Sequence, residues 1–175
     1  MSTTVRFAVP EDARFLPPIE SSAAQAFRVF KGLSWLADSP PIPVERHLEL
    51  IKRSMCWVAI DADNRPQGFL SADLYGRDLH VHELSVRQTM QGHGIGRKLV
   101  QVVQEFVGLK GLRAVTLTTF RHVPWNAPFY SRLGFQIESE QQVDERLSTL
   151  LSEEYEHGFP AGSRCAMVWR AGEEF

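Results

Sequence analysis

Short apolar runs recur along the chain, and their lengths and flanking turn residues are those of β-strands. Residues 56–86 hold three such runs, which are separated by turn residues at 63–64 and 76–78. Connections this short cannot carry a parallel crossover, so we expect these three strands to be antiparallel. Four further strands are expected at residues 5–9, 113–120, 135–140 and 164–170.

Helical spacing of apolar residues appears between these runs. From Ile95 onward, apolar side chains fall on one helical face, and Gly108 and Gly111 are expected to end this helix. Asn126 is expected to cap a short helix that ends at Gly134. Further helices are expected from residue 10, with a start or kink at residues 17–18, over residues 44–53, and around residues 146–155. This order of elements predicts an α/β (α+β) fold with a mixed sheet and helices on both faces.

Length, charge and cysteine content narrow the class of protein. The 175 residues fit a single domain over residues 1–175, and the net charge of −2 argues against nucleic acid as a partner. No apolar run is long enough to span a bilayer, and the first residues lack the apolar core of a signal peptide, so no membrane association is expected. Cys56 and Cys165 have no metal-ligand spacing and fit a reduced compartment, so we expect a cytoplasmic protein.

Three alternating glycines, at positions 92, 94 and 96, stand where the third strand of the meander gives way to the helix expected from Ile95. The start of a helix offers unpaired backbone N–H groups and about half a positive charge. Glycines leave these donors bare, and Arg97 and Lys98 add positive charge. The loop is therefore predicted to hold a phosphate or pyrophosphate.

Two familiar phosphate motifs do not fit this loop. In the dinucleotide pattern GxGxxG, Arg97 stands where the third glycine should be, and in the P-loop pattern Lys98 is followed by Leu99 rather than by Ser or Thr. A plain glycine-rich turn into a helix, with no ligand, remains the alternative.

Two motifs together point to a family. The loop reads Gln91-Gly92-His93-Gly94-Ile95-Gly96, and one strand later Tyr130 stands four residues before Gly134-Phe135. With these motifs the chain resembles the GCN5-related N-acetyltransferase (GNAT) superfamily, whose acetyl-CoA loop reads Gln/Arg-x-x-Gly-x-Gly/Ala. The resemblance covers nearly the whole chain. It implies a mixed, mostly antiparallel sheet of about seven strands, splayed at the acetyl-CoA site.

The resemblance implies where acetyl-CoA binds. The strand before the loop would pair with the acetyl-CoA arm, and a backbone N–H there would support the oxyanion of a tetrahedral intermediate. In much of the family an Asn stands where this chain has Val123, so the contact to the pantetheine arm comes from Asn126 or is absent. The implied acetyl-CoA contacts are Leu84, Ser85, Val86, Gln91, Gly92, His93, Gly94, Ile95, Gly96, Arg97, Lys98, Asn126, Phe129 and Tyr130.

Acetyl transfer to an amine poses two proton problems. An alkyl amine is mostly protonated at pH 7, with a reference pKa of about 10.4, and must lose a proton before it attacks the thioester. Glu83 is the first candidate for the base and Glu20 the second, although Glu83 also fits a surface charge or ion pair. The resemblance places Tyr130 to protonate the departing thiolate, with simple packing beside Phe129 as the alternative. The amine attacks directly, so no cysteine nucleophile is expected. No metal is expected either, because His80 and His82 lack further ligands in the sequence.

The acceptor is the least determined part. The resemblance implies a pocket built from residues 20–43 and 141–162, and we expect a small primary amine or a peptide N-terminus. Glu153, Glu154 and Glu156 would attract a cationic acceptor or simply form a solvated face. His80 and His82 alternate along one strand face, where they contact substrate or are exposed. The alternative function is a non-catalytic acyl-CoA-binding or sensor module on the same fold. A homodimer is common in the family.

Overall fold

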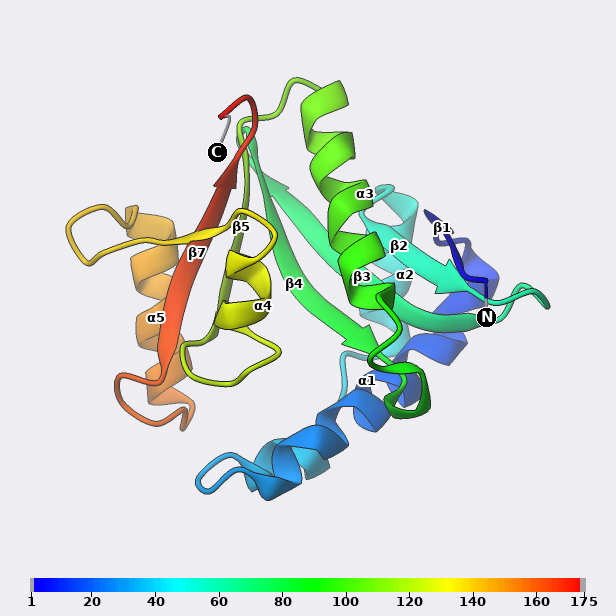
Figure 1. The fold of residues 1–175 in the computed structure, drawn as a ribbon, viewed down its shortest axis with the longest axis horizontal. Helices are drawn as coiled ribbons and strands as arrows, with labels where there is room; N and C mark the ends of the chain where they lie inside the picture. The colour runs from blue at the N-terminus through cyan, green and yellow to red at the C-terminus, as the bar shows by residue number, and fades with distance from the viewer. Residues whose placement is uncertain (1, 174–175) are drawn as a thin grey trace. The chain divides into compact units, whose positions relative to one another are not determined.

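The computed structural model describes residues 2–173 and contains one mixed sheet of seven strands in the order β1-β2-β3-β4-β5-β7-β6 (Figure 1). The strands are β1 (Thr4–Phe7), β2 (Cys56–Ile60), β3 (Pro66–Tyr75), β4 (Asp78–Val86), β5 (Ala114–Phe120), β6 (Gln136–Ile137) and β7 (Arg164–Arg170). The α-helices are α1 (Leu16–Ala24), α2 (Val44–Lys52), α3 (Ile95–Leu109), α4 (Ala127–Ser131) and α5 (Glu145–Glu156). The expected fold class and the number of strands are confirmed.

The chain forms two compact units, which are described separately. The first unit consists of the residues up to Asp73 together with Val81–Val103, and the second consists of Leu74–His80 and the residues from Gln104 onward. The boundary crosses β3, β4 and α3, so each of these three elements contributes one end to each unit. The expectation of a single domain concerns the chain as a whole and stays a prediction.

The core of the first unit lies between its helices and one face of β2 and β3. Apolar side chains from the first helical region (Leu16, Ile19) and from α2 (Ile51) pack on Val58 and Phe69 of the strands. The first residue of α3, Ile95, lies against Gly68 of β3, and Figure 1 shows α3 on the face opposite α1 and α2. Burying these side chains stabilises the unit by roughly 25 cal/mol per Å² of apolar surface removed from water.

The residues before α2 show how proline shapes the chain. A 3₁₀-helix over Pro10–Phe15 runs directly into α1, with two prolines in the first turn of α1, where a missing N–H costs least. This matches the expected helix start or kink at residues 17–18. Two more 3₁₀-helices, Gln25–Val29 and Ser34–Asp38, follow before α2. The helix expected over residues 44–53 is α2.

The second unit is built around β5 and β7, which are antiparallel along their whole length. Asp78, Leu79 and His80 of β4 pair in parallel with the first three residues of β5. Leu147 of α5 packs on Ala114, Ala166 and Val168, so α5 covers one face of this pair. Figure 1 shows α4 on the other face.

Two details of the predicted elements were wrong. The strand expected over residues 135–140 has only two residues, Gln136 and Ile137, both of them exposed at the edge of the sheet. Gly108 does not end α3, which continues to Leu109, and the left-handed turn that follows is made by Gly111 at φ +65°.

No helix among residues 2–173 is long and apolar enough to cross a membrane.

Candidate active site

The glycine loop (residues 91–96) leads from a short 3₁₀-turn at Gln88–Met90 into α3, which begins at Ile95 as the sequence predicts. Gly92 and Gly94 both have φ of +79°, a backbone conformation that other residues rarely adopt. A Cβ atom added at either position would meet nothing within 4 Å. The backbone here is therefore open to an incoming group and lies at a helix N-terminus, as an anion site requires.

The side chains of the loop hold its backbone in place. Gln91 Nε2 donates to the carbonyl of Val86 at 3.0 Å, and His93 Nδ1 donates to the carbonyl of Met90 at 3.2 Å. Lys98 Nζ donates to the backbone oxygen of Thr3 at 3.1 Å. Gln91 thus ties the loop back to the end of β4, which gives a structural reason for the glutamine that begins the motif.

The end of β4 carries Glu83 and the strand residues expected to meet acetyl-CoA. The hydroxyl of Ser85, a buried residue, donates to Glu83 Oε1 at 2.9 Å. Gly68 of β3 permits this strand to approach closely, because a Cβ there would stand 3.1 Å from the Ser85 carbonyl and 3.2 Å from Ile95. The role of Gly68 was missed from the sequence, where a lone glycine inside a strand indicates only a bulge or a close approach.

Glu20, the second candidate base, lies on α1 in the same unit as Glu83. Its carboxylate accepts a hydrogen bond from the backbone N–H of Ile42, at 3.1 Å to one oxygen and 3.3 Å to the other. Burial raises the pKa of Glu20, and the Ile42 hydrogen bond partly offsets this rise. A carboxylate with a raised pKa is a stronger base than an exposed one.

Tyr130 lies on α4 in the second unit and is 7 % exposed. Its ring packs edge-on against Phe129 and Phe135, at centroid distances of 5.1 and 5.5 Å. Gly134, at φ +90°, turns the chain so that Phe135 reaches back to this ring. The Tyr-x-x-x-Gly-Phe motif therefore fixes the orientation of the tyrosine.

Asn126 occupies the N-cap position of α4, but its side chain does not cap the helix. The expected capping role is wrong: Nδ2 lies 3.4 Å from the carbonyl of Trp125, and the backbone of Asn126 is at φ −110° and ψ −114°. Its Oδ1 atom is buried and has no hydrogen-bond partner among residues 2–173. A buried acceptor without a partner costs about 1–3 kcal/mol, so an N–H from a bound ligand would be stabilised here.

The predicted site residues thus fall in two groups. The glycine loop, Lys98, the end of β4, Glu83 and Glu20 belong to the first unit. Asn126, Phe129 and Tyr130 belong to the second unit.

A cavity of about 650 Å³ in the second unit lies along the segment expected to contribute to the acceptor pocket. Its lining includes Arg121, Glu140, Ser152 and Tyr155. Its volume falls within the range of small-molecule pockets. Arg164 forms part of one wall of this cavity.

The Arg164 cluster (Arg164, Glu154, Thr118, Phe120 and Phe159) was not predicted as a unit. Arg164 Nε donates to Glu154 at 2.9 Å, and the hydroxyl of Thr118 donates to the other Glu154 oxygen at 2.8 Å. The guanidinium lies over the rings of Phe120 and Phe159, at 4.5 and 4.7 Å. Of the three acids expected to act alike, Glu154 is therefore committed to an ion pair, whereas Glu153 and Glu156 are exposed.

Other reactive side chains are buried. Burial raises the pKa of Cys56 to about 12 and also raises the pKa of Cys165, which disfavours a thiolate nucleophile. His80 is only 3 % exposed, so exposure, one of the two alternatives expected for it, is wrong. No group of three His, Cys, Asp or Glu side chains within residues 2–173 is arranged to hold a metal ion.

Comparison with known families gives one match. The model of the acetyltransferase (GNAT) family matches residues 21–135, which is more than half of the chain. The matched segment includes both sequence motifs, the glycine loop and Tyr130 with Gly134-Phe135.

Solved structures with the same fold cover nearly the whole chain. The PaiA N-acetyltransferase of Thermoplasma acidophilum, in complex with coenzyme A, is 20% identical with a TM-score of 0.69, over 97% of this chain and 99% of that one. A phosphinothricin acetyltransferase of Sinorhizobium meliloti, in complex with AcCoA, is 17% identical with a TM-score of 0.69, over 99% and 90%. The ribosomal-protein-S18-alanine N-acetyltransferase of Escherichia coli is 12% identical with a TM-score of 0.68, over 99% and 97%. At these identities the likeness establishes the fold.

Proposed function

Because the chain belongs to the GNAT acetyltransferase family, we propose that it is an acetyl-CoA-dependent N-acetyltransferase acting on a primary amine of a small molecule or peptide. The observation that carries this proposal is the glycine loop, with its exposed backbone at the start of α3 and its positive φ angles at Gly92 and Gly94. Two of the structural neighbours are complexes with coenzyme A or AcCoA, which supports the choice of ligand.

Three parts of the protein offer groups that complement acetyl-CoA. The backbone N–H groups of residues 92–96 and the charge of Arg97 suit the pyrophosphate, while Leu84, Ser85 and Val86 supply strand backbone for the pantetheine arm and the oxyanion. The unpartnered Oδ1 of Asn126 suits an amide N–H, the donor that a pantetheine arm carries. This favours Asn126 as the residue that replaces the family asparagine missing at Val123.

The reaction is a direct attack of the neutral amine on the thioester, with no acyl-enzyme intermediate. Glu83 or Glu20 accepts the proton of the ammonium form. The raised pKa of Glu20 supports it as a base, and the Ser85 hydroxyl that binds Glu83 would hold that carboxylate in one orientation. The hydroxyl of Tyr130 donates a proton to the departing thiolate, and the packing of its ring supports a fixed orientation.

The acceptor is specified only by class. The names of two neighbours, a phosphinothricin acetyltransferase and a ribosomal-protein-alanine acetyltransferase, show one fold serving a small molecule and a protein. The cavity along α5 supports a small amine held by the second unit. Its mixed lining, with Arg121 and Glu140 of opposite charge, gives no preference for a dication.

A test is release of free CoA thiol from acetyl-CoA with a panel of primary amines, peptides, alcohols and thiols. We expect turnover with at least one amine or peptide N-terminus and none with the alcohols or thiols alone. Acetyl-CoA binding without turnover on any amine would favour the alternative, a sensor module on the same fold. Turnover only with alcohols or thiols would contradict the choice of acceptor.

A further inference from the structure

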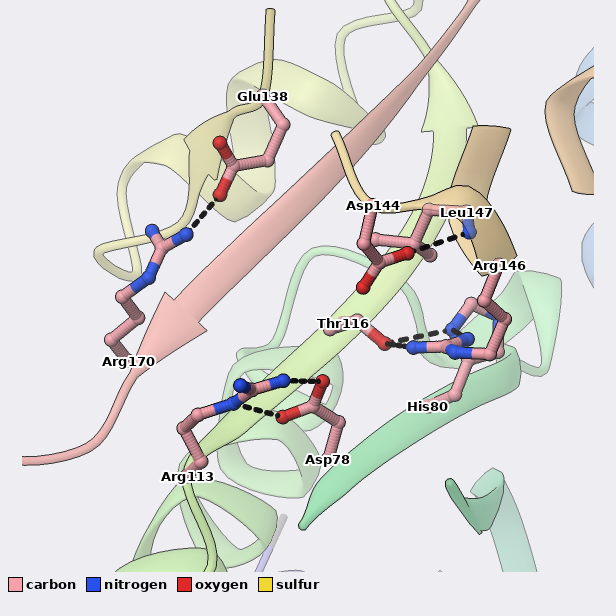
Figure 2. Close-up of polar contacts among 9 residues, drawn as sticks. All are labelled: Asp78, His80, Arg113, Thr116, Glu138, Asp144, Arg146, Leu147 and Arg170. Atoms are coloured by element: carbon pink, nitrogen blue, oxygen red, sulfur yellow. Dashed lines mark hydrogen bonds and ion pairs between the residues drawn. The ribbon is translucent and has the colours of Figure 1, made fainter. Parts of the chain in front are cut away.

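A second cavity in the second unit, of about 220 Å³, has no part in the proposed acetyl transfer. It lies where β5 and β7 meet the residues that lead into α5, and it is lined by charges of both signs (Figure 2). We call it the Arg113–Arg170 cavity; its polar lining is Asp78, Arg113, Thr116, Glu138, Gln142, Asp144 and Arg170.

Two buried carboxylates orient the two arginines of this cavity. Arg113 donates from Nε and Nη2 to the two oxygens of Asp78, at 2.9 and 2.6 Å. Arg170 Nη2 donates to Glu138 Oε1. The carboxylates are 7 % and 6 % exposed, whereas the side chains of Arg113 and Arg170 are 64 % and 40 % exposed. Each arginine is thus held in place by a buried carboxylate, and its side chain remains partly exposed, with N–H groups that do not bind that carboxylate.

Thr116 forms a wall of the cavity, but its hydroxyl is already used. Arg146 Nη2 donates to Thr116 Oγ1 at 3.0 Å, and the Thr116 hydroxyl lies 2.9 Å from His80 Nδ1. Arg146 Nη1, which can only donate, also lies 3.2 Å from His80 Nδ1, so this nitrogen is an acceptor. Figure 2 shows the three side chains drawn together. The threonine therefore shapes the cavity without offering it a donor.

Asp144 supplies the acceptor that remains. Its Oδ1 accepts the backbone N–H of Leu147 at 2.8 Å and so caps α5. Asp144 is exposed, and its Oδ2 accepts no hydrogen bond from another residue within 2–173. The pKa of Arg113 is raised mainly by its hydrogen bonds to Asp78 and then by the charge of Asp78. The charge of Asp144 adds the smallest contribution, which shows that Asp144 lies near Arg113.

The open groups of the cavity are therefore cationic donors on one side and an anionic acceptor on the other. Its two arginines and three carboxylates leave a net charge of −1, which disfavours a dianion such as phosphate. A simple amine would meet two guanidinium groups. We propose that the Arg113–Arg170 cavity binds a small zwitterion, with its carboxylate on the outward N–H groups of the two arginines and its ammonium on Asp144.

Size narrows the ligand further. Liquid water would fill the cavity with roughly seven molecules, so it suits a free amino acid with a small side chain or a short ω-amino acid. Charge-assisted hydrogen bonds at both ends give the ligand its orientation. This site is independent of acetyl-CoA, so it stands or falls separately from the proposed acetyltransferase activity.

The test is an NMR titration of the full chain without acetyl-CoA. L-Alanine and 4-aminobutyrate are the zwitterion probes, and acetate and methylammonium are the half-ligand controls. At least one zwitterion is expected to shift the amide signals around Arg113, Asp144 and Arg170 saturably, with one ligand per chain. Acetate binding as tightly as the zwitterions, or no saturable shift with either zwitterion, would overturn the proposal.

A matched pair of variants tests the ammonium end. Asp144→Asn keeps a good N-cap but removes the charge, so it should leave the melting temperature unchanged and weaken zwitterion binding by about tenfold. Glu145→Gln removes the neighbouring charge, which does not line the cavity, and should leave binding unchanged. Equal affinity in Asp144→Asn and the wild type would contradict the proposed role of Asp144.

Discussion

The glycine loop of the first unit and the Arg164 cluster of the second use polar groups in opposite ways. In the loop, exposed backbone at the start of α3 is left open by Gly92 and Gly94. In the cluster, Glu154 and Arg164 satisfy each other, with Thr118 and two aromatic rings closing the group. Open donors cost little in a solvated loop and gain energy only when a ligand arrives, whereas a closed buried ion pair stabilises the fold only while both partners remain.

The largest expected effect is on kcat, from a change at Tyr130. This residue tests the comparison, because its ring packs between Phe129 and Phe135 while its hydroxyl is proposed to donate a proton. Tyr130→Phe keeps the ring and removes the proton donor. We expect kcat to fall by roughly 10²–10⁴-fold, with little change in the Kd for acetyl-CoA. Steady-state kinetics and calorimetry measure the two quantities. Unchanged kcat would assign Tyr130 to packing alone.

The next effect should be a loss of stability at the Arg164 cluster. Glu154→Gln leaves the guanidinium of Arg164 without a counter-charge, at a site where both side chains are only 12–13 % exposed. The free energy of unfolding should fall by about 3 kcal/mol, as for other broken buried pairs. Chemical denaturation measures it. The exposed Glu156→Gln should change it by less than about 0.5 kcal/mol, and equal effects would show that the cluster is not stabilising.

His47, a buried titratable side chain of the first unit, extends the comparison, because its Nε2 has no hydrogen-bond partner among residues 2–173. It is fully buried on α2, with Nδ1 3.5 Å from the Ser71 hydroxyl, and burial, followed by the charge of Arg46, lowers its pKa from 6.5 to about 4. Because the unfolded chain binds the proton more tightly, the His47 contribution is fully present above about pH 6.5 and is lost as the pH falls to 4.

The expected loss is about 3 kcal/mol between pH 7 and pH 4. Denaturation curves across this range, compared between wild type and His47→Gln, isolate this contribution. His122→Gln, at an exposed position, is the control and should keep the wild-type slope. A slope that survives in His47→Gln would show that other groups cause it.

The smallest expected effect sharpens the account of the loop. Gly94→Asp and Gly94→Asn both tolerate a positive φ better than most residues, and both add a side chain where nothing lies within 4 Å. Only the aspartate would repel a phosphate, so its Kd for acetyl-CoA should exceed that of the asparagine variant by about tenfold. Equal Kd values would mean that no anion sits at Gly94.

Much of the fold and the position of the glycine loop could be predicted from local sequence signals. The lengths of apolar runs placed β2 to β5 and β7, and α2 was expected after a proline-rich loop. The glycine loop was placed at the start of α3 because glycine and helix-start signals are local. Edge pairing was not predictable for residues 135–140, because only contact with β7 decides how many residues form β6.

Side-chain partnerships across the sequence were not predictable either. Asn126 stands at a helix start, as a cap would, and only the backbone angles reveal that its side chain does not cap α4. Glu154 and Glu156 look equivalent in the sequence, but one meets Arg164 and the other meets solvent. Such differences depend on which strand lies beneath a helix.

The most direct test of the central claim is thermal melting with acetyl-CoA, with ATP and NAD as controls. At about one hundred times its Kd, a ligand of the folded state adds roughly 2.7 kcal/mol, which should raise the melting temperature by roughly 5–10 °C for a chain of this size. We predict this rise with acetyl-CoA and none with ATP or NAD. No rise with acetyl-CoA, or a rise with ATP or NAD instead, would contradict the assignment of the glycine loop and, with it, the roles given to Glu83, Glu20 and Tyr130.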